Sequence, residues 1–160
     1  MEFTYHRSLG PVIGVLLGIA IVELLVVHLV VVSLLGWTAA IIVGVIDLSL
    51  VITLIALLRS FRRLPVTIAD GVLTMRAGFL KSIAVPVAQI DKMRSHWDSA
   101  TIKDRHVLNL ALASWPSVVV DLRQPVVLPT GRTINAVAHK LDDPAAFHAA
   151  IAAVSGADDR

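Results

Sequence analysis

The chain of 160 residues contains no cysteine, and charged residues make up only 16% of it. Without cysteine the chain can form no disulfide bond, no thiolate metal site and no cysteine nucleophile. Soluble globular domains have roughly 25% charged residues, so charge is scarce here, and the deficit is concentrated in one region. Between residues 9 and 58 the ionisable residues are Glu23, His28 and Asp47 alone. This distribution predicts a membrane-embedded region followed by a small globular domain.

The charge that is present is nearly balanced. The formal net charge is +2 at pH 7, and from residue 64 onward ten Lys or Arg residues stand against nine Asp residues. Nucleic-acid-binding domains concentrate basic residues on one face, so the sequence argues against a nucleic-acid partner. A glycine-rich phosphate loop and the catalytic motifs GxSxG and HExxH are also absent from the sequence. We therefore expect neither catalysis nor a cofactor.

Two apolar segments, at about 11–35 and 38–58, are each long enough for a transmembrane helix, which needs roughly 20 residues. Gly36 and Trp37 leave room only for a tight turn, and Trp37 stands where an interfacial aromatic residue is expected. The sequence therefore predicts an antiparallel transmembrane hairpin within residues 1–63.

Flanking charge predicts the orientation of this hairpin. Arg7 precedes the first segment, Arg59, Arg62 and Arg63 follow the second, and the turn carries no charge. The positive-inside rule then places both termini in the cytoplasm. We expect the three arginines after the second segment to contact lipid headgroups.

Glu23, His28 and Asp47 interrupt the apolar segments at similar depths, because folding at residues 36–37 brings Asp47 opposite Val26. An ionised side chain at the bilayer centre costs roughly 2.5–3.5 kcal/mol, so each needs a partner. Neutral hydrogen-bonded groups that lock the hairpin or an oligomer are the first interpretation. An intramembrane metal or cofactor ligand set and a proton- or ion-handling site are the alternatives. Glu23 and His28 diverge by about 140° around the helix, which favours two different partners.

Gly10, Gly14 and Gly18 form a stripe of small residues at a spacing of four. Such stripes allow helices to approach closely. The stripe predicts either packing within the hairpin or association with a second copy or another membrane protein.

From residue 64 onward the pattern changes to short alternating stretches. Asp70-Gly71 is a hairpin turn signal between VTIA and VLTMRA, and SIAVP reads as a third strand. Further strands are expected within 90–97, 101–112, 117–128 and 133–141. Together these stretches predict a twisted antiparallel sheet or barrel.

The domain is expected to end with a helix over 144–154. Asp143 is a favourable N-cap and Pro144 a favourable first helical residue. Phe147, Ile151 and Val154 would form one apolar stripe that packs on the sheet. Residues 155–160 are expected to form a tail.

The stretches ADGVLTMRAGFL, VPVAQI, VVVDLRQPV and LDDPAAFHAAI resemble the bacterial pleckstrin-homology-like domain family over about residues 64–154. The resemblance implies two near-orthogonal sheets that form an open β-barrel capped by a C-terminal helix. Two N-terminal spans joined to such a domain are similar to small proteins of the bacterial inner membrane. The resemblance implies a cytoplasmic binding or assembly module rather than an enzyme, and no site residue is carried over from it.

Lys92, Arg94 and His96 would share one face of an expected strand, beside Trp97. A basic face held just below a membrane could contact anionic lipid headgroups. Because neighbouring aspartates interrupt it, a solvated face is the alternative interpretation.

The sequence thus predicts a membrane-anchored binding or scaffolding protein that forms oligomers and has no catalytic activity. The alternative is an intramembrane metal, cofactor or proton-handling site built from Glu23, His28 and Asp47. The two hypotheses differ in whether these three side chains act as ligands or as packing contacts.

Overall fold

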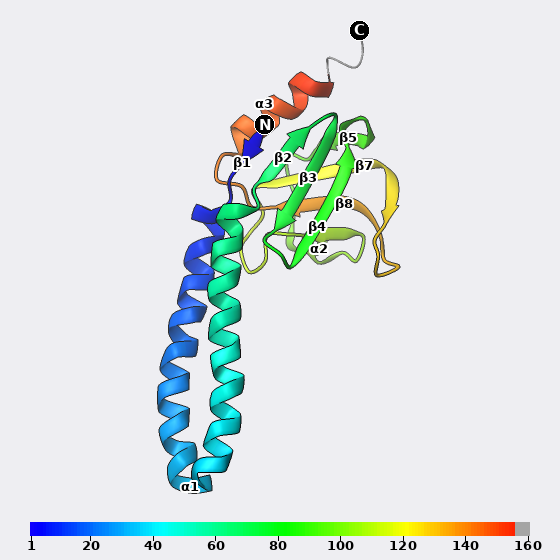
Figure 1. Cartoon of the computed structure of the whole chain (residues 1–160). Coiled ribbons are helices and arrows are strands. Elements are labelled where there is room, and N and C mark those ends of the chain that lie inside the picture. The colour runs from blue at the N-terminus through cyan, green and yellow to red at the C-terminus, as the bar shows by residue number, and fades with distance from the viewer. Residues whose placement is uncertain (156–160) are drawn as a thin grey trace.

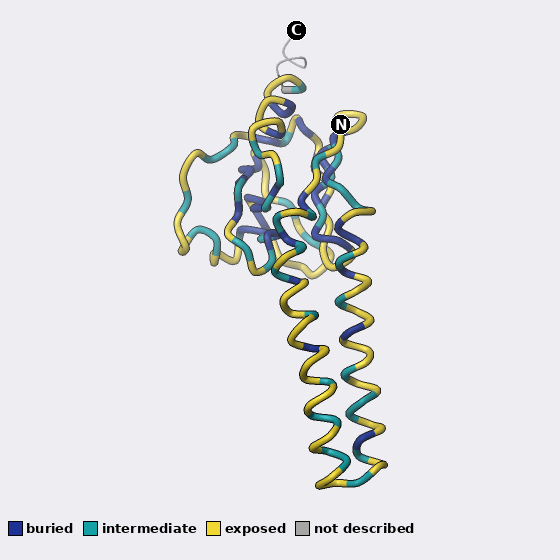
Figure 2. Tube along the Cα trace, turned by 90° about the vertical axis from the view of Figure 1, so that its left-hand side faces the viewer, coloured by how far each residue is buried: buried dark blue, intermediate teal, exposed yellow. Residues whose placement is uncertain are grey.

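The computed structural model describes residues 1–155, which form a helical rod joined to a β domain (Figure 1). The rod is α1 (His6–Arg63), whose mean hydropathy reaches 2.9, so this helix is long and apolar enough to cross a membrane. Gly36 interrupts it with φ 81° and ψ 179°, values outside the helical region. At this residue the chain folds back, so that a first arm (6–35) and a second arm (37–63) run side by side in Figures 1 and 2.

The arms meet along a narrow seam of buried residues. In the second arm Ala40, Val51, Leu57 and Phe61 are buried, while most other apolar side chains of both arms are exposed. Figure 2 shows this contrast as scattered buried positions along the arms and a continuous buried region in the β domain. The arms therefore present an apolar surface on their outer sides.

The β domain consists of two four-stranded sheets. The first sheet has the order β1-β2-β3-β4 and is antiparallel throughout, with strands β1 (Glu2–Phe3), β2 (Val66–Ala69), β3 (Val72–Ala77) and β4 (Lys81–Pro86). The second has the order β5-β7-β8-β6, with strands β5 (Ile90–Met93), β6 (Val107–Asn109), β7 (Val118–Val127) and β8 (Thr133–His139). The strands of the described residues form two sheets and not a closed barrel.

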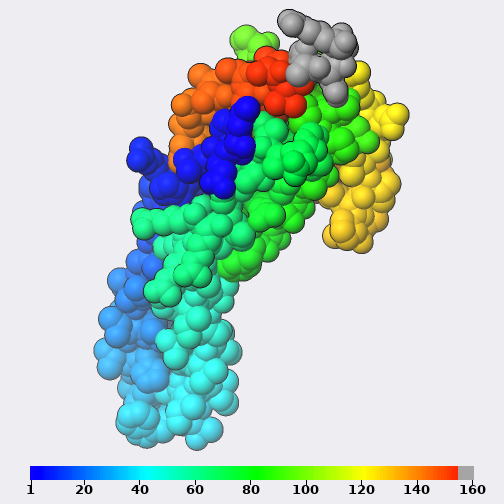
Figure 3. Space-filling model, turned by 45° about the horizontal axis from the view of Figure 1, so that its top comes forward, coloured from blue at the N-terminus to red at the C-terminus, as the bar shows by residue number. Residues whose placement is uncertain are grey.

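Three short helices complete the domain: η1 (Val87–Gln89), α2 (Ser99–Lys103) and α3 (Pro144–Ser155). The prediction of a C-terminal helix that starts at Pro144 is confirmed, and the Asp143 carboxylate accepts a hydrogen bond from Ala146 N at 2.9 Å. Phe147 is buried and contacts Phe3 edge to face, with ring centroids 5.2 Å apart. Figure 3 shows the resulting contact between α3 and the N-terminal strand.

One hydrophobic core continues from the two sheets into the nearby ends of both arms. Leu73, Val118 and Ile134 of the sheets belong to the same buried cluster as Leu9 and Phe61 of α1. The first turn of the first arm and the last turn of the second arm are therefore part of the β domain's core.

Several predicted elements agree with this structure. The Asp70-Gly71 turn joins β2 to β3 with positive φ at both residues (52° and 71°), as a tight hairpin turn requires. The coarse prediction of a long apolar N-terminal segment followed by a mainly-β domain and a short terminal helix is also confirmed. Of the tail predicted at 155–160, Ser155 ends α3 and the rest lies outside the described residues.

The strand predicted within 101–112 is confirmed only over Val107–Asn109, which forms β6. Asp98 accepts a hydrogen bond from Thr101 N at 2.8 Å and starts α2, so only β6 remains extended in this stretch. The expectation of purely antiparallel pairing also fails here, because β6 runs parallel to β8. The predicted strand over 90–97 ends at Met93. Strand β1, which pairs with β2, was not predicted.

Gly78 allows the turn between β3 and β4 to lie against α1. Its φ is 55°, and a Cβ added to it would clash with the Ser60 side chain and lie 3.1 Å from Leu57. We expect Gly78→Ala to lower the free energy of unfolding by about 3 kcal/mol, the sum of left-handed backbone strain and overpacking. Urea unfolding in detergent, followed by tryptophan fluorescence, measures the change.

Gly71→Ala is the matched control, because Gly71 has φ 71° but no atom within 4 Å of an added Cβ. We expect Gly71→Ala to lower the free energy of unfolding by about 1–2 kcal/mol, which is the backbone strain alone. If the two variants lose equal free energy of unfolding, the close packing of Gly78 on α1 does not contribute to stability.

Candidate functional site

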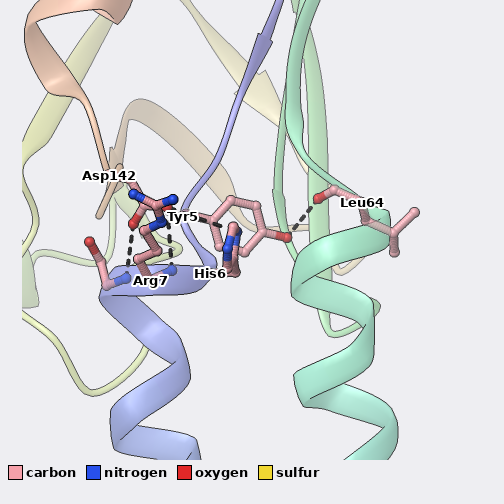
Figure 4. A network of polar contacts seen from close by, with 6 residues as sticks. Tyr5, His6, Arg7, Leu64 and Asp142 are labelled. Carbon is pink, nitrogen blue, oxygen red and sulfur yellow. Dashed lines mark hydrogen bonds and ion pairs between the residues drawn. The ribbon is translucent and has the colours of Figure 1, made fainter.

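The Tyr5 side chain joins the two arms to the β domain. Tyr5 directly precedes α1 and is 0% exposed. Its hydroxyl donates a hydrogen bond to Leu64 O at 2.7 Å, at the end of the second arm (Figure 4), and accepts one from Gly78 N at 2.9 Å. Burial raises the pKa of Tyr5, so the phenol keeps its proton and can donate. One hydroxyl group thus connects the first arm, the second arm and the β3–β4 turn.

His139 packs on the ring of Tyr5, with ring centroids 4.9 Å apart, and is completely buried. Its Nδ1 accepts a hydrogen bond from Lys140 N at 2.7 Å, and its Nε2 lies 2.7 Å from Arg76 O. A carbonyl can only accept, so Nε2 carries the proton of the neutral ring. Burial lowers the pKa of His139 to about 4. The junction between arms and domain therefore contains an uncharged histidine.

Asp142 caps the first arm from the β domain (Figure 4). Its carboxylate accepts hydrogen bonds from Ser8 N at 2.9 Å and Arg7 N at 3.3 Å, and it lies 3.9 Å from Nδ1 of His6. Burial acts to raise the pKa of Asp142, but hydrogen bonds from Ser8, Thr4 and the helix N-terminus hold it below its usual value. The free N–H groups of the first helical turn thus have a charged partner.

A surface groove opens between the arms beside this junction, with a volume of about 750 Å³. Both arms contribute to it. Its lining combines four basic side chains with small and apolar residues: His6, Arg7, Gly10, Pro11, Gly14, Leu17, Ile55, Leu58, Arg59 and Arg62. Of the three arginines predicted to contact headgroups, Arg59 and Arg62 lie here. Arg63 lines the adjoining hollow, which shares Ile55 and Arg59 with this one. We call this feature the basic groove.

The structure does not bring Glu23, His28 and Asp47 together as one ligand set. His28 is half-buried against Gly44, where an added Cβ would lie 3.3 Å from its Nδ1. Asp47 has a buried Oδ2 without a hydrogen-bond partner among the described residues. Glu23 is exposed and lines a different hollow with Gly18. No group of three potential metal ligands forms anywhere in residues 1–155.

The glycine stripe makes no close contact between the arms: Gly10 and Gly14 line the basic groove, and Gly18 lines the hollow that contains Glu23. A Cβ added to Gly10, Gly14 or Gly18 would meet no atom within 4 Å, whereas Gly44 lies directly against His28. Gly44 is therefore the glycine that lets the arms approach, and it was not among the glycines predicted to do so. The sequence does contain a pattern that points to Gly44: it lies four residues after Ala40, another small residue, which is buried between the arms.

Lys92, Arg94 and His96 line one shallow hollow together with Asp121. The Arg94 guanidinium is bound to the Asp121 carboxylate, with Nη2 2.7 Å and Nε 2.9 Å from its oxygens. This hydrogen bonding raises the pKa of Arg94. Because Arg94 comes from the β5 end and Asp121 from β7, the pair fastens two strands and leaves Lys92 and His96 as the exposed basic side chains.

Comparison of the chain with models of protein families, with curated proteins and with solved structures finds no match. The resemblance to the pleckstrin-homology-like family stays a prediction.

Tyr5→Phe tests the junction. Without the hydroxyl, the Leu64 carbonyl and the Gly78 amide lose their partner in a buried site, which we expect to lower the free energy of unfolding by about 2 kcal/mol or more. Urea unfolding in detergent measures this. Ser82→Ala, which removes a hydroxyl from an exposed position of β4, should change stability by less than about 0.5 kcal/mol. A Tyr5→Phe protein as stable as the wild type would contradict the role of the hydroxyl.

The low pKa of His139 predicts a loss of stability in mild acid. Below pH 6.5 the unfolded chain binds a proton at this ring, while the folded protein does not until about pH 4. Stability is therefore complete above pH 6.5 and falls towards pH 4, by about 2 kcal/mol at pH 5. Unfolding curves at pH 7.5 and pH 5 measure the difference.

His139→Gln should remove this part of the pH dependence, although it lowers stability at pH 7.5. His96→Gln, at an exposed histidine, should retain the pH dependence of the wild type. If His139→Gln and the wild type lose equal stability between the two pH values, another group is responsible.

Proposed function

We propose that this protein is a membrane-anchored binding or scaffolding module whose two arms cross the bilayer as a hairpin. The observation that carries the proposal is the apolar outer surface of the arms, where Leu29 is 73% and Leu34 77% exposed. Contact of such a continuous surface with water is strongly unfavourable, at about 25 cal/mol per Å². Contact with lipid removes that cost. At 1.5 Å rise per residue, segments 11–35 and 38–58 span about 37 and 31 Å, against roughly 30 Å of hydrocarbon.

The distribution of charge supports an orientation with both termini and the β domain in the cytoplasm of a bacterial cell. Arg7, Arg59, Arg62 and Arg63 all lie at the domain end of the arms, and the turn at Gly36 has no charged residue. The positive-inside rule assigns the arginine-rich end to the cytoplasm. Trp37, 71% exposed beside the turn, has the position of an aromatic anchor at the opposite interface.

The β domain is the binding part of the proposed module. Two sheets with a C-terminal helix are compatible with the pleckstrin-homology-like architecture that the sequence resembles. β4 forms the edge of the first sheet and β6 the edge of the second, so each has an edge at which a partner strand can add. Because Tyr5 and Asp142 tie the domain to both arms, these edges are held in a fixed direction relative to the membrane.

An intramembrane metal or cofactor site is the less favoured function. Glu23 lines one hollow and His28 another, and Asp47 forms no ion pair with His28 within the described part of the chain. The half-buried side chains of His28 and Asp47 suit packing between the arms, and the exposed Glu23 suits association with a second copy. The glycine stripe makes no close contact with the opposite arm and is accessible to lipid or to another helix.

Cysteine labelling tests the topology cleanly, because the natural chain has no cysteine. Thr38→Cys places a thiol beside the turn, and Thr130→Cys places one on an exposed loop of the β domain. We expect a membrane-impermeant maleimide to label Thr38→Cys in intact spheroplasts, and Thr130→Cys only after lysis. Both variants should remain in the membrane pellet after alkaline carbonate extraction.

Release of the protein by carbonate would refute membrane insertion. Labelling of Thr130→Cys in intact spheroplasts, with Thr38→Cys protected, would reverse the proposed orientation. Labelling of both variants in intact spheroplasts would show that the turn and the β domain do not lie on opposite sides of the membrane.

A further inference from the structure

The basic groove has a charged end and an apolar end. His6 and Arg7 begin the first arm, and Arg59 and Arg62 lie near the end of the second, so all four basic residues are at the domain end. Further along the arms the lining changes to Gly14, Leu17 and Ile55, among other small and apolar residues. From Arg7 to Leu17 the groove extends about 15 Å along the first arm, at 1.5 Å per residue.

Two glycines give the groove its depth. A Cβ at Gly10 or Gly14 would meet no protein atom within 4 Å, so the space above the helix backbone at these positions is open. The resulting hollow of about 750 Å³ lies between the arms and is continuous with their apolar outer surface. This volume lies within the range of roughly 300–1,000 Å³ that is typical of ligand-binding sites.

The basic side chains of the groove are available for an anion. Arg7, Arg59 and Arg62 form no side-chain ion pair within residues 1–155. The nearby carboxylate is that of Asp142, which lies 3.9 Å from His6 and already accepts hydrogen bonds from Arg7 N and Ser8 N. This end of the groove therefore carries a net positive charge, because it has three guanidinium groups and only one carboxylate, that of Asp142.

We propose that the basic groove binds one anionic phospholipid of the cytoplasmic leaflet. Its phosphate lies among Arg7, Arg59 and Arg62, and one acyl chain lies over Gly10 and Gly14 between the arms. Arginine suits this position because its planar fork of N–H groups matches the oxygens of a phosphate. The proposal rests on the insertion of the hairpin proposed above, which places the arginines at headgroup level.

The alternatives fit the groove less well. Inorganic phosphate would leave the apolar floor at Leu17 and Ile55 empty. A second copy related by a two-fold axis at this groove would bring the same basic residues face to face, and like charges repel. A lipid matches both ends of the groove at once.

Native mass spectrometry of the full-length protein in detergent tests the proposal with two probes, phosphatidylglycerol and phosphatidylcholine. We expect one molecule of phosphatidylglycerol to be retained, at least about fivefold in preference to phosphatidylcholine, and not to be displaced by millimolar inorganic phosphate. Arg62→Gln should reduce retention about fivefold, corresponding to about 1 kcal/mol per basic residue near a membrane surface. Gly14→Leu should abolish it by filling the floor.

Two controls separate the groove from general effects. Gly18→Leu makes the same change one turn further along, outside the groove, and Arg63→Gln removes the same charge from the neighbouring hollow. Both should retain lipid as the wild type does. Equal retention of the two lipids, or equal loss in Gly14→Leu and Gly18→Leu, would overturn the proposal. Displacement of the lipid by inorganic phosphate would also overturn the proposal, because the groove would then bind a free anion. A wild-type dimer that dissociates in Gly14→Leu would overturn it too, because the occupant would then be a second copy.

Carbonate extraction of the same variants distinguishes this proposal from the proposed function. Variants that stay in the membrane but fail the lipid comparison refute the lipid site alone. A wild-type protein released by carbonate refutes the membrane anchor and the lipid site together.

Discussion

The hydroxyl group of Tyr5 is the interaction on which the arrangement of the whole chain depends. It connects residues 59 and 73 positions away, Leu64 at the end of the second arm and Gly78 in the β3–β4 turn. Two helices and a sheet that meet at one buried point must leave no polar group unpaired. Tyr5 satisfies this condition because its oxygen both donates and accepts, which phenylalanine could not do. The close approach of the turn is possible only because residue 78 is glycine.

This junction joins the two arms and the β domain through contacts between segments that are far apart in the sequence. β1, which precedes α1 in the sequence, pairs with β2, which follows it. Asp142 caps the first arm, and one hydrophobic core includes residues of both the arms and the sheets. In the proposed function the consequence is orientation, because the edges of the sheets keep a constant direction relative to the bilayer. The same junction positions the basic groove, since it holds His6 and Arg7 of the first arm beside Arg59 and Arg62 of the second.

The role of individual charges depended on partners that the local sequence does not reveal. Arg94 and Lys92 looked equivalent in an alternating stretch, yet Arg94 is bound to Asp121, 27 residues away, while Lys92 is exposed. The glycines behaved similarly. The regular stripe of Gly10, Gly14 and Gly18 makes no close contact with the opposite arm, whereas Gly44, which belongs to no such stripe, lies against His28. Spacing shows which residues share a face of one helix, but not which face meets a neighbour.

The sequence by itself determined the elements whose causes lie within a few residues. The apolar composition of α1, its interruption at Gly36, the Asp70-Gly71 turn and the start of α3 at Pro144 all depend on local composition and backbone preference. Only the tertiary structure decided the pairing of β1, the parallel entry of β6, the burial of His139 and the contacts of Tyr5. These features join segments far apart in the chain, and their free energy comes from burial and from the pairing of polar groups that become neighbours only when the chain folds.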